Sequence, residues 1–172
     1  CDLILVSDYG HGFISNKVAK IFSSSKNFFS LNAQINASNR GYHSLRKYKK
    51  IDNLIINENE LRHEMRDKVE NIEKLSLKLI KDLKVNRLTV TRGKNGAILI
   101  EKNGKTVSSP AFANKVIDKV GAGDAMLVVI SLCMKMKMPS DLVLFLGSLA
   151  GATAVENIGN SKFINKNELL RQ

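Results

Sequence analysis

The sequence predicts an α/β fold with a mainly parallel sheet flanked by helices. Three features favour this class: short apolar segments recur along the chain, amphipathic helical patterns separate them, and a hairpin signal precedes a largely helical end. The chain has 172 residues, of which 44% are hydrophobic, so it can bury a substantial core. Its length favours a single domain, and no internal repeat or low-complexity linker divides it.

Four apolar segments are expected to form the parallel strands. Leu3–Val6 is apolar on both faces, which is typical of a strand in a sheet covered by helices on both sides. The other three are Phe28–Leu31, Asn53–Asn57 and Arg87–Thr91. Ligands of open α/β sheets bind at the carboxyl ends of the strands. The polar segments after the strands are therefore the candidate binding positions: 8–12, 32–40, 57–60 and 91–96.

Helical patterns and one hairpin account for most of the remaining chain. The hairpin is predicted over Ala97–Ile100 and Thr106–Ser108, because Asn103-Gly104 between them is a strong turn signal. Ser15-Asn16 can cap the first helix, and Pro139 separates two helices of the C-terminal part. The expected helices are 14–26, 58–65, 71–83, 122–136, 140–157 and a short one near 166–170.

Charge and cysteine content restrict the function classes. The 27 Lys and Arg against 16 Asp and Glu give +11, which suits anionic partners such as nucleotides or phosphosugars, and equally a solubilising surface. The basic run Arg46–Lys50 indicates a solvated face; its single Tyr48 is too little for a base-stacking platform, so no nucleic-acid partner is expected. Cys1 and Cys133 make no disulfide framework, which indicates a reducing, cytoplasmic location. The apolar stretch Leu142–Val155 is too short for a membrane span, so no membrane partner is expected.

Several common catalytic patterns are absent from the sequence. It has no Gly-x-x-x-x-Gly-Lys-Ser/Thr, no Gly-x-Gly-x-x-Gly after a strand and no Gly-x-Ser-x-Gly. His11, His43 and His63 lack metal-ligand spacing. The P-loop, dinucleotide-binding, serine hydrolase and zinc classes are therefore not supported.

The segment Gly121–Asp124 is the one that carries chemistry. Its small residues precede an apolar helix, where bare backbone N–H groups and the helix dipole favour an anion. Gly121, Ala122 and Gly123 would let a phosphate approach the backbone closely, as an anion hole. Asp124 in the first turn could accept a proton from an alcohol during phosphoryl transfer. The alternative is a glycine-rich loop with an Asp cap and no catalytic role.

Three motifs in order resemble the PfkB, or ribokinase-like, carbohydrate kinases. Asp118–Asp124 is similar to the Asp-Thr-x-Gly-Ala-Gly-Asp signature of that family. Asn57–Glu60 matches its Asn-x-x-Glu motif, and Thr91–Gly96 matches its Thr-x-Gly-x-x-Gly nucleotide loop. Lys119 stands where the signature usually has Thr, and Met126 where it has Phe, which we interpret as a solvent-facing change and a packing change.

The resemblance implies a role for each matched residue. It implies that Asp124 is the catalytic base and that Gly121, Ala122 and Gly123 form the anion hole beside it. It also implies ATP and Mg²⁺ as cofactors. Asn57 and Glu60 would order the Mg²⁺ through water. Nucleotide contacts would come from Thr91, Gly93, Gly96 and Asn160, the last beside the adenine. A monovalent cation is an optional addition in this family.

A narrower resemblance concerns the molecule that accepts the phosphoryl group. Ser7–Gly12 is similar to the Asp-Tyr-x-Lys-Gly segment of heptose-phosphate kinases, with His11 at the usual lysine position. Asn32–Tyr42 resembles the same branch, whose members are fused to, or found beside, nucleotidyltransferase domains. By this resemblance the acceptor is a sugar or phosphosugar such as a heptose 7-phosphate, with Asp8 and Asn32 as substrate contacts.

The resemblance covers all 172 residues but only the C-terminal, ATP-binding and catalytic part of such a kinase domain. The N-terminal part and its lid are expected to be missing, so residues 1–172 alone are expected to be inactive. Family members often dimerise through the lid, so the resemblance allows a homodimer. The alternative function is a non-catalytic nucleotide-binding or assembly domain derived from a sugar kinase.

Overall fold

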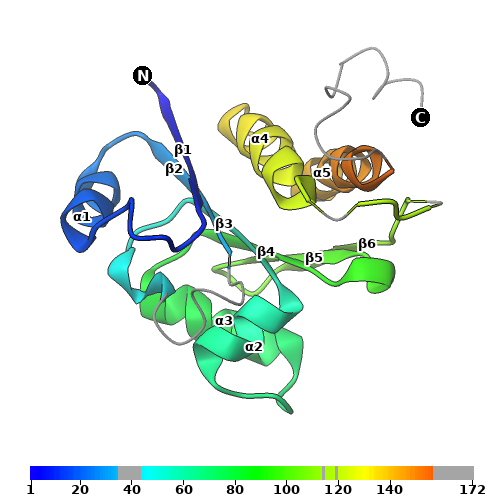
Figure 1. The fold of residues 1–172 in the computed structure, drawn as a ribbon, viewed down its shortest axis with the longest axis horizontal. Coiled ribbons are helices and arrows are strands. Elements are labelled where there is room, and N and C mark those ends of the chain that lie inside the picture. The colour runs from blue at the N-terminus through cyan, green and yellow to red at the C-terminus, as the bar shows by residue number, and fades with distance from the viewer. Residues whose placement is uncertain (35–43, 114, 119, 157–172) are drawn as a thin grey trace.

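The computed structural model contains one sheet of six strands, in the order β1-β2-β3-β4-β5-β6 (Figure 1). The structure describes residues 1–34, 44–113, 115–118 and 120–156. The strands are β1 Leu3–Asp8, β2 Phe28–Ala33, β3 Asn53–Asn57, β4 Arg87–Thr91, β5 Ala97–Glu101 and β6 Thr106–Ser109. β1 to β4 pair in parallel, whereas β4–β5 and β5–β6 are antiparallel, which confirms a mainly parallel sheet with a hairpin at its end.

Side-chain caps mark the starts of several helices, and the sequence predicts one of these caps. Ser15 accepts a hydrogen bond from the backbone of Val18 at the start of α1, and Asn71 caps α3 in the same way. Pro139 lies between α4 and α5, as the sequence predicts, and is the N-cap residue of α5. The helices are α1 Asn16–Ser24, α2 Glu58–Met65, α3 Ile72–Leu83, α4 Ala122–Lys135 and α5 Ser140–Val155, with the 3-10 turns η1 Leu45–Lys47 and η2 Gly93–Asn95. The short helix expected near 166–170 lies outside the described residues.

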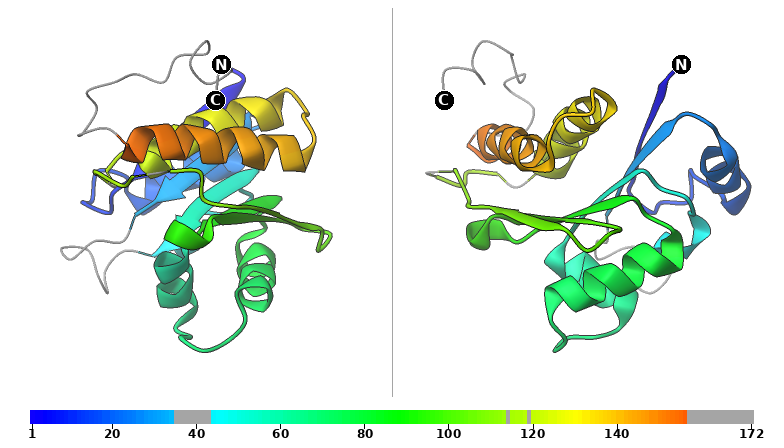
Figure 2. Two further views of the ribbon diagram at one scale, coloured as in Figure 1. Left: turned by 90° about the vertical axis from the view of Figure 1, so that its right-hand side faces the viewer. Right: turned by 180° about the vertical axis from the view of Figure 1, so that it is seen from behind.

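Helices cover the two faces of the sheet in separate layers (Figure 2). Parallel strands added in one direction through right-handed crossovers leave their connecting helices on one face, where α1, α2 and α3 lie. Helices α4 and α5 follow the hairpin and cover the other face. Alternation along the strands divides the core accordingly: Leu54 and Ile56 belong to the first cluster, and Ile55 belongs to the second.

Burial bears on two expectations from the sequence. Met126, interpreted as a packing change, packs against Gly151 of α5, and Cys133 is buried in the same α4 layer. The basic run is only partly a solvated face: Arg46 and Lys49 are exposed, but Tyr48 is completely buried. No helix in the described part of the chain has both the length and the apolarity needed to cross a bilayer.

Candidate active site

Parallel register brings the predicted site segments to one edge of the sheet. Asp8 is level with Ala33, and Asn57 is level with Thr91, each pair at the carboxyl ends of adjacent strands. From β1 to β4 the sheet spans three inter-strand spacings, about 14 Å. A ligand with a polyphosphate chain could lie along this edge.

Asp124 lies at this edge, in the first turn of α4. The N-cap residue Gly121 has a φ of +85° and no side chain with which to cap this helix end. The Oγ of Ser7 donates a 2.7 Å hydrogen bond to Oδ1 of Asp124, and the Tyr9 hydroxyl donates a 2.8 Å bond to Oδ2. Each carboxylate oxygen is thus held by one donor from the end of β1, and each retains a further lone pair for a substrate proton.

The contact with Asp124 is reflected in the pKa of Tyr9. The carboxylate accepts the phenol proton in a hydrogen bond, and burial adds to this, so the pKa of Tyr9 lies above its usual value of 10.0. Tyr9 therefore stays a protonated donor over the physiological range, and a donor is what holds an ionised carboxylate in place.

Gly123 has a steric role in addition to the role expected of its backbone N–H. A Cβ at this position would lie 3.2 Å from Nδ2 of Asn32. Asn32 is itself buried: its Nδ2 donates to the carbonyl of Ile55, and its Oδ1 accepts from Gln34. The absence of a side chain at Gly123 lets the start of α4 sit directly on the end of β2.

Asn57 and Glu60 form a reciprocal capping box at the start of α2. The Asn57 Oδ1 accepts from the Glu60 N–H at 2.9 Å, and the Glu60 Oε2 accepts from the Asn57 N–H at 2.7 Å. Both oxygens are thus already engaged by backbone N–H groups. They are hard oxygen donors of the kind that Mg²⁺ accepts through its water shell, so the pair fits an indirect Mg²⁺ role. Among the residues described, no cluster of three His, Cys, Asp or Glu side chains could bind a metal directly.

The Thr91–Gly96 segment is a tight turn beside this capping box. Its backbone bonds run from Arg92 N–H to the Gly96 carbonyl and from Gly96 N–H to the Gly93 carbonyl. Gly96 is buried, with a φ of +74°, and a Cβ there would lie 2.0 Å from the Ser109 carbonyl oxygen. Arg92 pairs with Glu58 at 3.5 Å, which joins this segment to the Asn57–Glu60 motif.

Asp8 has an environment different from that of an open substrate contact. It is 3% exposed, and its Oδ2 accepts from the Tyr48 hydroxyl at 2.6 Å and pairs with Lys47 Nζ at 2.7 Å. Its Oδ1 accepts from the Gly10 N–H. The role of Asp8 as a direct substrate contact stays a prediction, and one that would require exchange of these partners.

Sequence reasoning missed four side chains that contact the predicted site residues. Ser7 and Tyr9 contact Asp124 across more than 100 residues, and Lys47 and Tyr48 contact Asp8. Strand alternation could have separated Ser7 and Tyr9 from Asp8, because successive strand residues face opposite ways. Asn160 and Lys119 lie outside the described residues.

Comparison with known proteins identifies the same family as the sequence motifs. The pfkB family carbohydrate kinase model matches residues 5–167. The chain is 27% identical over 172 residues to a bifunctional protein HldE of Koribacter versatilis, covering 98% of this chain and 34% of the relative. It is 28% identical over 163 residues to the HldE protein of Campylobacter fetus, again with 34% of the relative covered. The chain thus spans about a third of the length of these curated relatives.

Solved structures share the fold. An Arabidopsis thaliana ribokinase, complexed with ribose and ATP, superimposes with a TM-score of 0.78 at 20% identity, over 99% of this chain and 55% of that protein. A Thermotoga maritima ribokinase gives 0.78 at 19% identity, over 99% of this chain and 56% of that protein. These likenesses confirm the ribokinase-like fold. With the family model covering nearly the whole sequence, the chain belongs to the pfkB family of carbohydrate kinases.

Proposed function

We propose that the protein containing this chain transfers the γ-phosphoryl group of ATP to a hydroxyl of a sugar or phosphosugar. The hydroxyl oxygen forms a bond to phosphorus as the bond between the γ-phosphorus and the bridging β,γ-oxygen breaks. The hydroxyl proton passes to the Asp124 carboxylate, and ADP leaves. Membership of a carbohydrate kinase family supports this reaction class.

The observation that carries the proposal is the placement of Asp124. It stands in the first turn of a helix whose N-cap residue, Gly121, has no side chain, and it is held at both oxygens by Ser7 and Tyr9. The first-turn N–H groups from Gly121 to Gly123 would stabilise the charge of the transferred phosphoryl group. A fixed carboxylate beside an anion site provides the two functions that this transfer requires.

The nucleotide would lie along the carboxyl edge towards β4. Thr91, Gly93 and Gly96 would contact it there, with Asn160 near the adenine. Mg²⁺, when bound, neutralises phosphate charge, and Asn57 and Glu60 would order its waters. The adjacency of the two motifs through the Arg92–Glu58 pair supports one shared phosphate region.

For the acceptor we infer a heptose 7-phosphate or a close phosphosugar. Support comes from the likeness of Ser7–Gly12 to heptose-phosphate kinases and from the HldE relatives. Those relatives are named bifunctional, so a fused or adjacent nucleotidyltransferase domain is part of the proposal. Asn32 and Asp8 are the proposed acceptor-side residues. Residues 1–172 by themselves are proposed to be inactive, because they cover only 55–56% of the two ribokinase chains.

Replacement of Asp124 tests the proposal. In the full protein that contains this chain, Asp124→Asn should lower kcat by about 10²–10⁴-fold, the usual contribution of a positioned general base. ATP affinity should persist, because backbone N–H groups rather than the carboxylate hold the phosphates. The measurement is steady-state phosphorylation of heptose 7-phosphate together with calorimetric Mg·ATP binding.

A matched control is Asp141→Asn, which removes an exposed first-turn aspartate from the neighbouring helix α5. It should leave kcat unchanged. Near wild-type turnover by Asp124→Asn would refute the base assignment and favour the non-catalytic nucleotide-binding alternative.

A further inference from the structure

A buried ionic cluster lies on the face of the sheet opposite Asp124. Its centre is Asp8, whose Oδ2 is held by Tyr48 and Lys47 and whose Oδ1 is held by the Gly10 N–H. Tyr48 is completely buried, and the Lys47 side chain is 15% exposed. The cluster therefore fixes the last residue of β1 from within the core.

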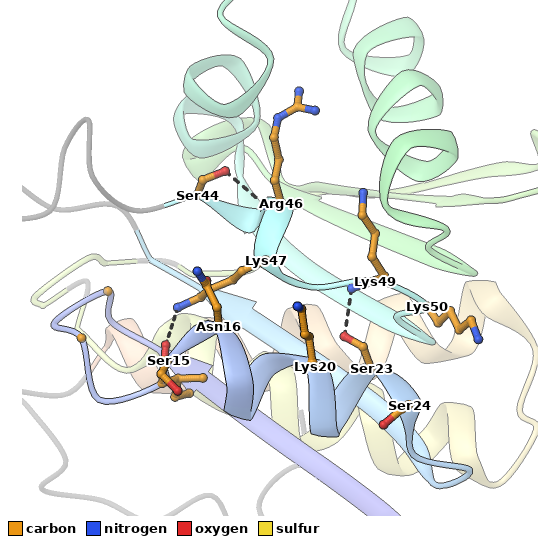
Figure 3. A pocket seen from close by; sticks show the side chains of 13 residues that line it. Ser15, Asn16, Lys20, Ser23, Ser24, Ser44, Arg46, Lys47, Lys49 and Lys50 are labelled. Carbon is orange, nitrogen blue, oxygen red and sulfur yellow. Dashed lines mark hydrogen bonds between the residues drawn. The ribbon is translucent and has the colours of Figure 1, made fainter.

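Lys47 makes a second contact that extends this constraint along the chain. Its Nζ donates a 2.9 Å hydrogen bond to the carbonyl of Ile14, just before α1. Figure 3 shows Lys47 reaching towards this loop, whereas Arg46 and Lys49 extend away from it. Both ends of the segment between β1 and α1 are thus attached to residues 47–48.

The groove around Lys47 does not itself indicate a ligand. It has a volume of about 1000 Å³ and is lined by several cations, including Arg46 and Lys49 (Figure 3). Arg46 pairs with Glu64 at 3.4 Å, and Lys49 donates to the Asp82 carbonyl at 2.7 Å. Much of the groove's positive charge is therefore engaged within the chain, and Lys47 has the most specific role.

Strand geometry connects this cluster to the active site. Ser7 and Asp8 are the last two residues of β1, and their side chains point to opposite faces; Tyr9 follows directly after the strand. The bond from the Gly10 N–H to Asp8 also closes a turn around Tyr9. Holding the Asp8 side chain therefore holds the backbone from which Ser7 and Tyr9 reach Asp124.

We propose that Lys47 and Tyr48 are positioning residues for the phosphoryl transfer: through Asp8, they set the end of β1 so that Ser7 and Tyr9 hold the Asp124 carboxylate. This inference rests on the proposed function in assigning Asp124 the role of base. Lys47 and Tyr48 act through Asp8 and the end of β1, not by contact with the reacting atoms.

The test uses Tyr48→Phe and Lys47→Met in the full protein that contains this chain. Tyr48→Phe keeps the buried ring and removes one oxygen, so it serves if Lys47→Met fails to fold. The first readout is the pKa of Tyr9, followed by NMR of ¹³Cζ-labelled tyrosine and assigned by its loss in Tyr9→Phe. The second readout is kcat and KM for heptose 7-phosphate phosphorylation.

If the proposal holds, both variants lower the pKa of Tyr9 towards 10.0, because its bond to Asp124 is weakened. They lower kcat by up to about 10²-fold, as expected for a misplaced catalytic group, with little change in the KM for ATP. Lys47→Arg, which keeps the positive charge, retains the wild-type Tyr9 pKa and kcat. Lys49→Met is the matched control, since it removes a neighbouring, exposed lysine without touching Asp8, and it changes neither readout.

An unchanged Tyr9 pKa in folded Tyr48→Phe would overturn the proposal. So would a lowered pKa with unchanged kcat, provided that Asp124→Asn is inactive in the same assay. If Asp124→Asn also turns over normally, the proposed function has failed, and the Tyr9 pKa still reports separately whether the cluster holds Tyr9 against Asp124.

Discussion

Two aspartates, at the end of β1 and the start of α4, have different environments, which match the separate roles proposed for them. Asp124 is half-buried, is held by two hydroxyl donors and faces the carboxyl edge of the sheet. Asp8 is buried on the other face beside a lysine and a tyrosine. A carboxylate that accepts a substrate proton must be accessible to the substrate. A buried carboxylate that holds a strand end needs hydrogen-bond partners within the protein for both oxygens.

The pKa of Asp8 makes a pH-dependent prediction at this scale. Burial raises the pKa, but hydrogen bonds from Lys47, Tyr48 and the Gly10 N–H outweigh it, so the folded-state pKa lies below 3.8. A depressed folded-state pKa contributes stability that is present above the unfolded value, about 3.9, and lost as pH falls through the folded value. The free energy of unfolding, measured with urea between pH 6 and pH 2.5, should therefore decrease on acidification.

Asp8→Asn should show a flatter pH dependence than the wild type, because this carboxylate no longer titrates. Asp67→Asn is the comparison variant: backbone N–H groups of Glu70 and Val69 lower the pKa of this carboxyl too, but it lies near the surface, so its removal should flatten the slope less than Asp8→Asn does. An Asp8→Asn slope equal to that of the wild type would show that the cluster contributes nothing through ionisation.

At the scale of single elements, the Asn57–Glu60 motif has two separable roles. The structure shows a capping box that stabilises α2, and the proposed function adds ordering of Mg²⁺ waters. Glu60→Gln retains an oxygen that can accept from the Asn57 N–H, so thermal stability should change little. The Mg²⁺ concentration needed for half-maximal activity should rise, since the amide carries no charge.

Titration of activity with Mg²⁺, beside thermal melts of the same preparations, checks this prediction. Glu60→Ala is the companion variant, and loss of the hydrogen bond to the Asn57 N–H should cost about 1 kcal/mol in stability. If Glu60→Gln shows the wild-type Mg²⁺ dependence, the motif is a helix cap alone.

The hairpin element depends on Gly96 for space as well as for conformation. A Cβ there would lie 2.0 Å from the Ser109 carbonyl oxygen, so β6 would have to move. Gly104 in the hairpin turn has a φ of +89° but nothing within 4 Å, so Gly104→Ala carries only the backbone strain, about 1–2 kcal/mol. Urea unfolding should show Gly96→Ala losing clearly more stability than Gly104→Ala; equal losses would mean that the strand end adapts freely.

At the scale of the whole molecule, the sheet has β1 at one edge of its strand order. Leu5 in this strand is 39% exposed, although Val6 beside it is buried. Unpaired strand edges with apolar side chains promote association. A protein of only these 172 residues should therefore form dimers or larger species at high concentration, as measured by light scattering.

Leu5→Lys should shift this association to higher concentration, because a lysine on an edge strand opposes pairing. Leu77→Lys is the control, since it changes a similarly exposed leucine on α3, away from the sheet edge. A monomer at all accessible concentrations would contradict the prediction.

The sequence by itself determined the elements and the placement of the motifs on them. Asn53–Asn57, Glu58–Met65 and Arg87–Thr91 form with the predicted bounds, because strand runs and helix caps are local signals within a few residues. The first turn of α4 also carries Asp124 as expected, for the same reason.

Only the tertiary structure decided which side chains meet. Asp124 is held by Ser7 and Tyr9, and the basic run folds inwards so that Lys47 and Tyr48 hold Asp8. These contacts join segments up to 117 residues apart and depend on strand order and on the packing of helices against each face. Local periodicity specifies neither the strand order nor this packing, because it shows which face of an element is apolar but not which partner covers that face.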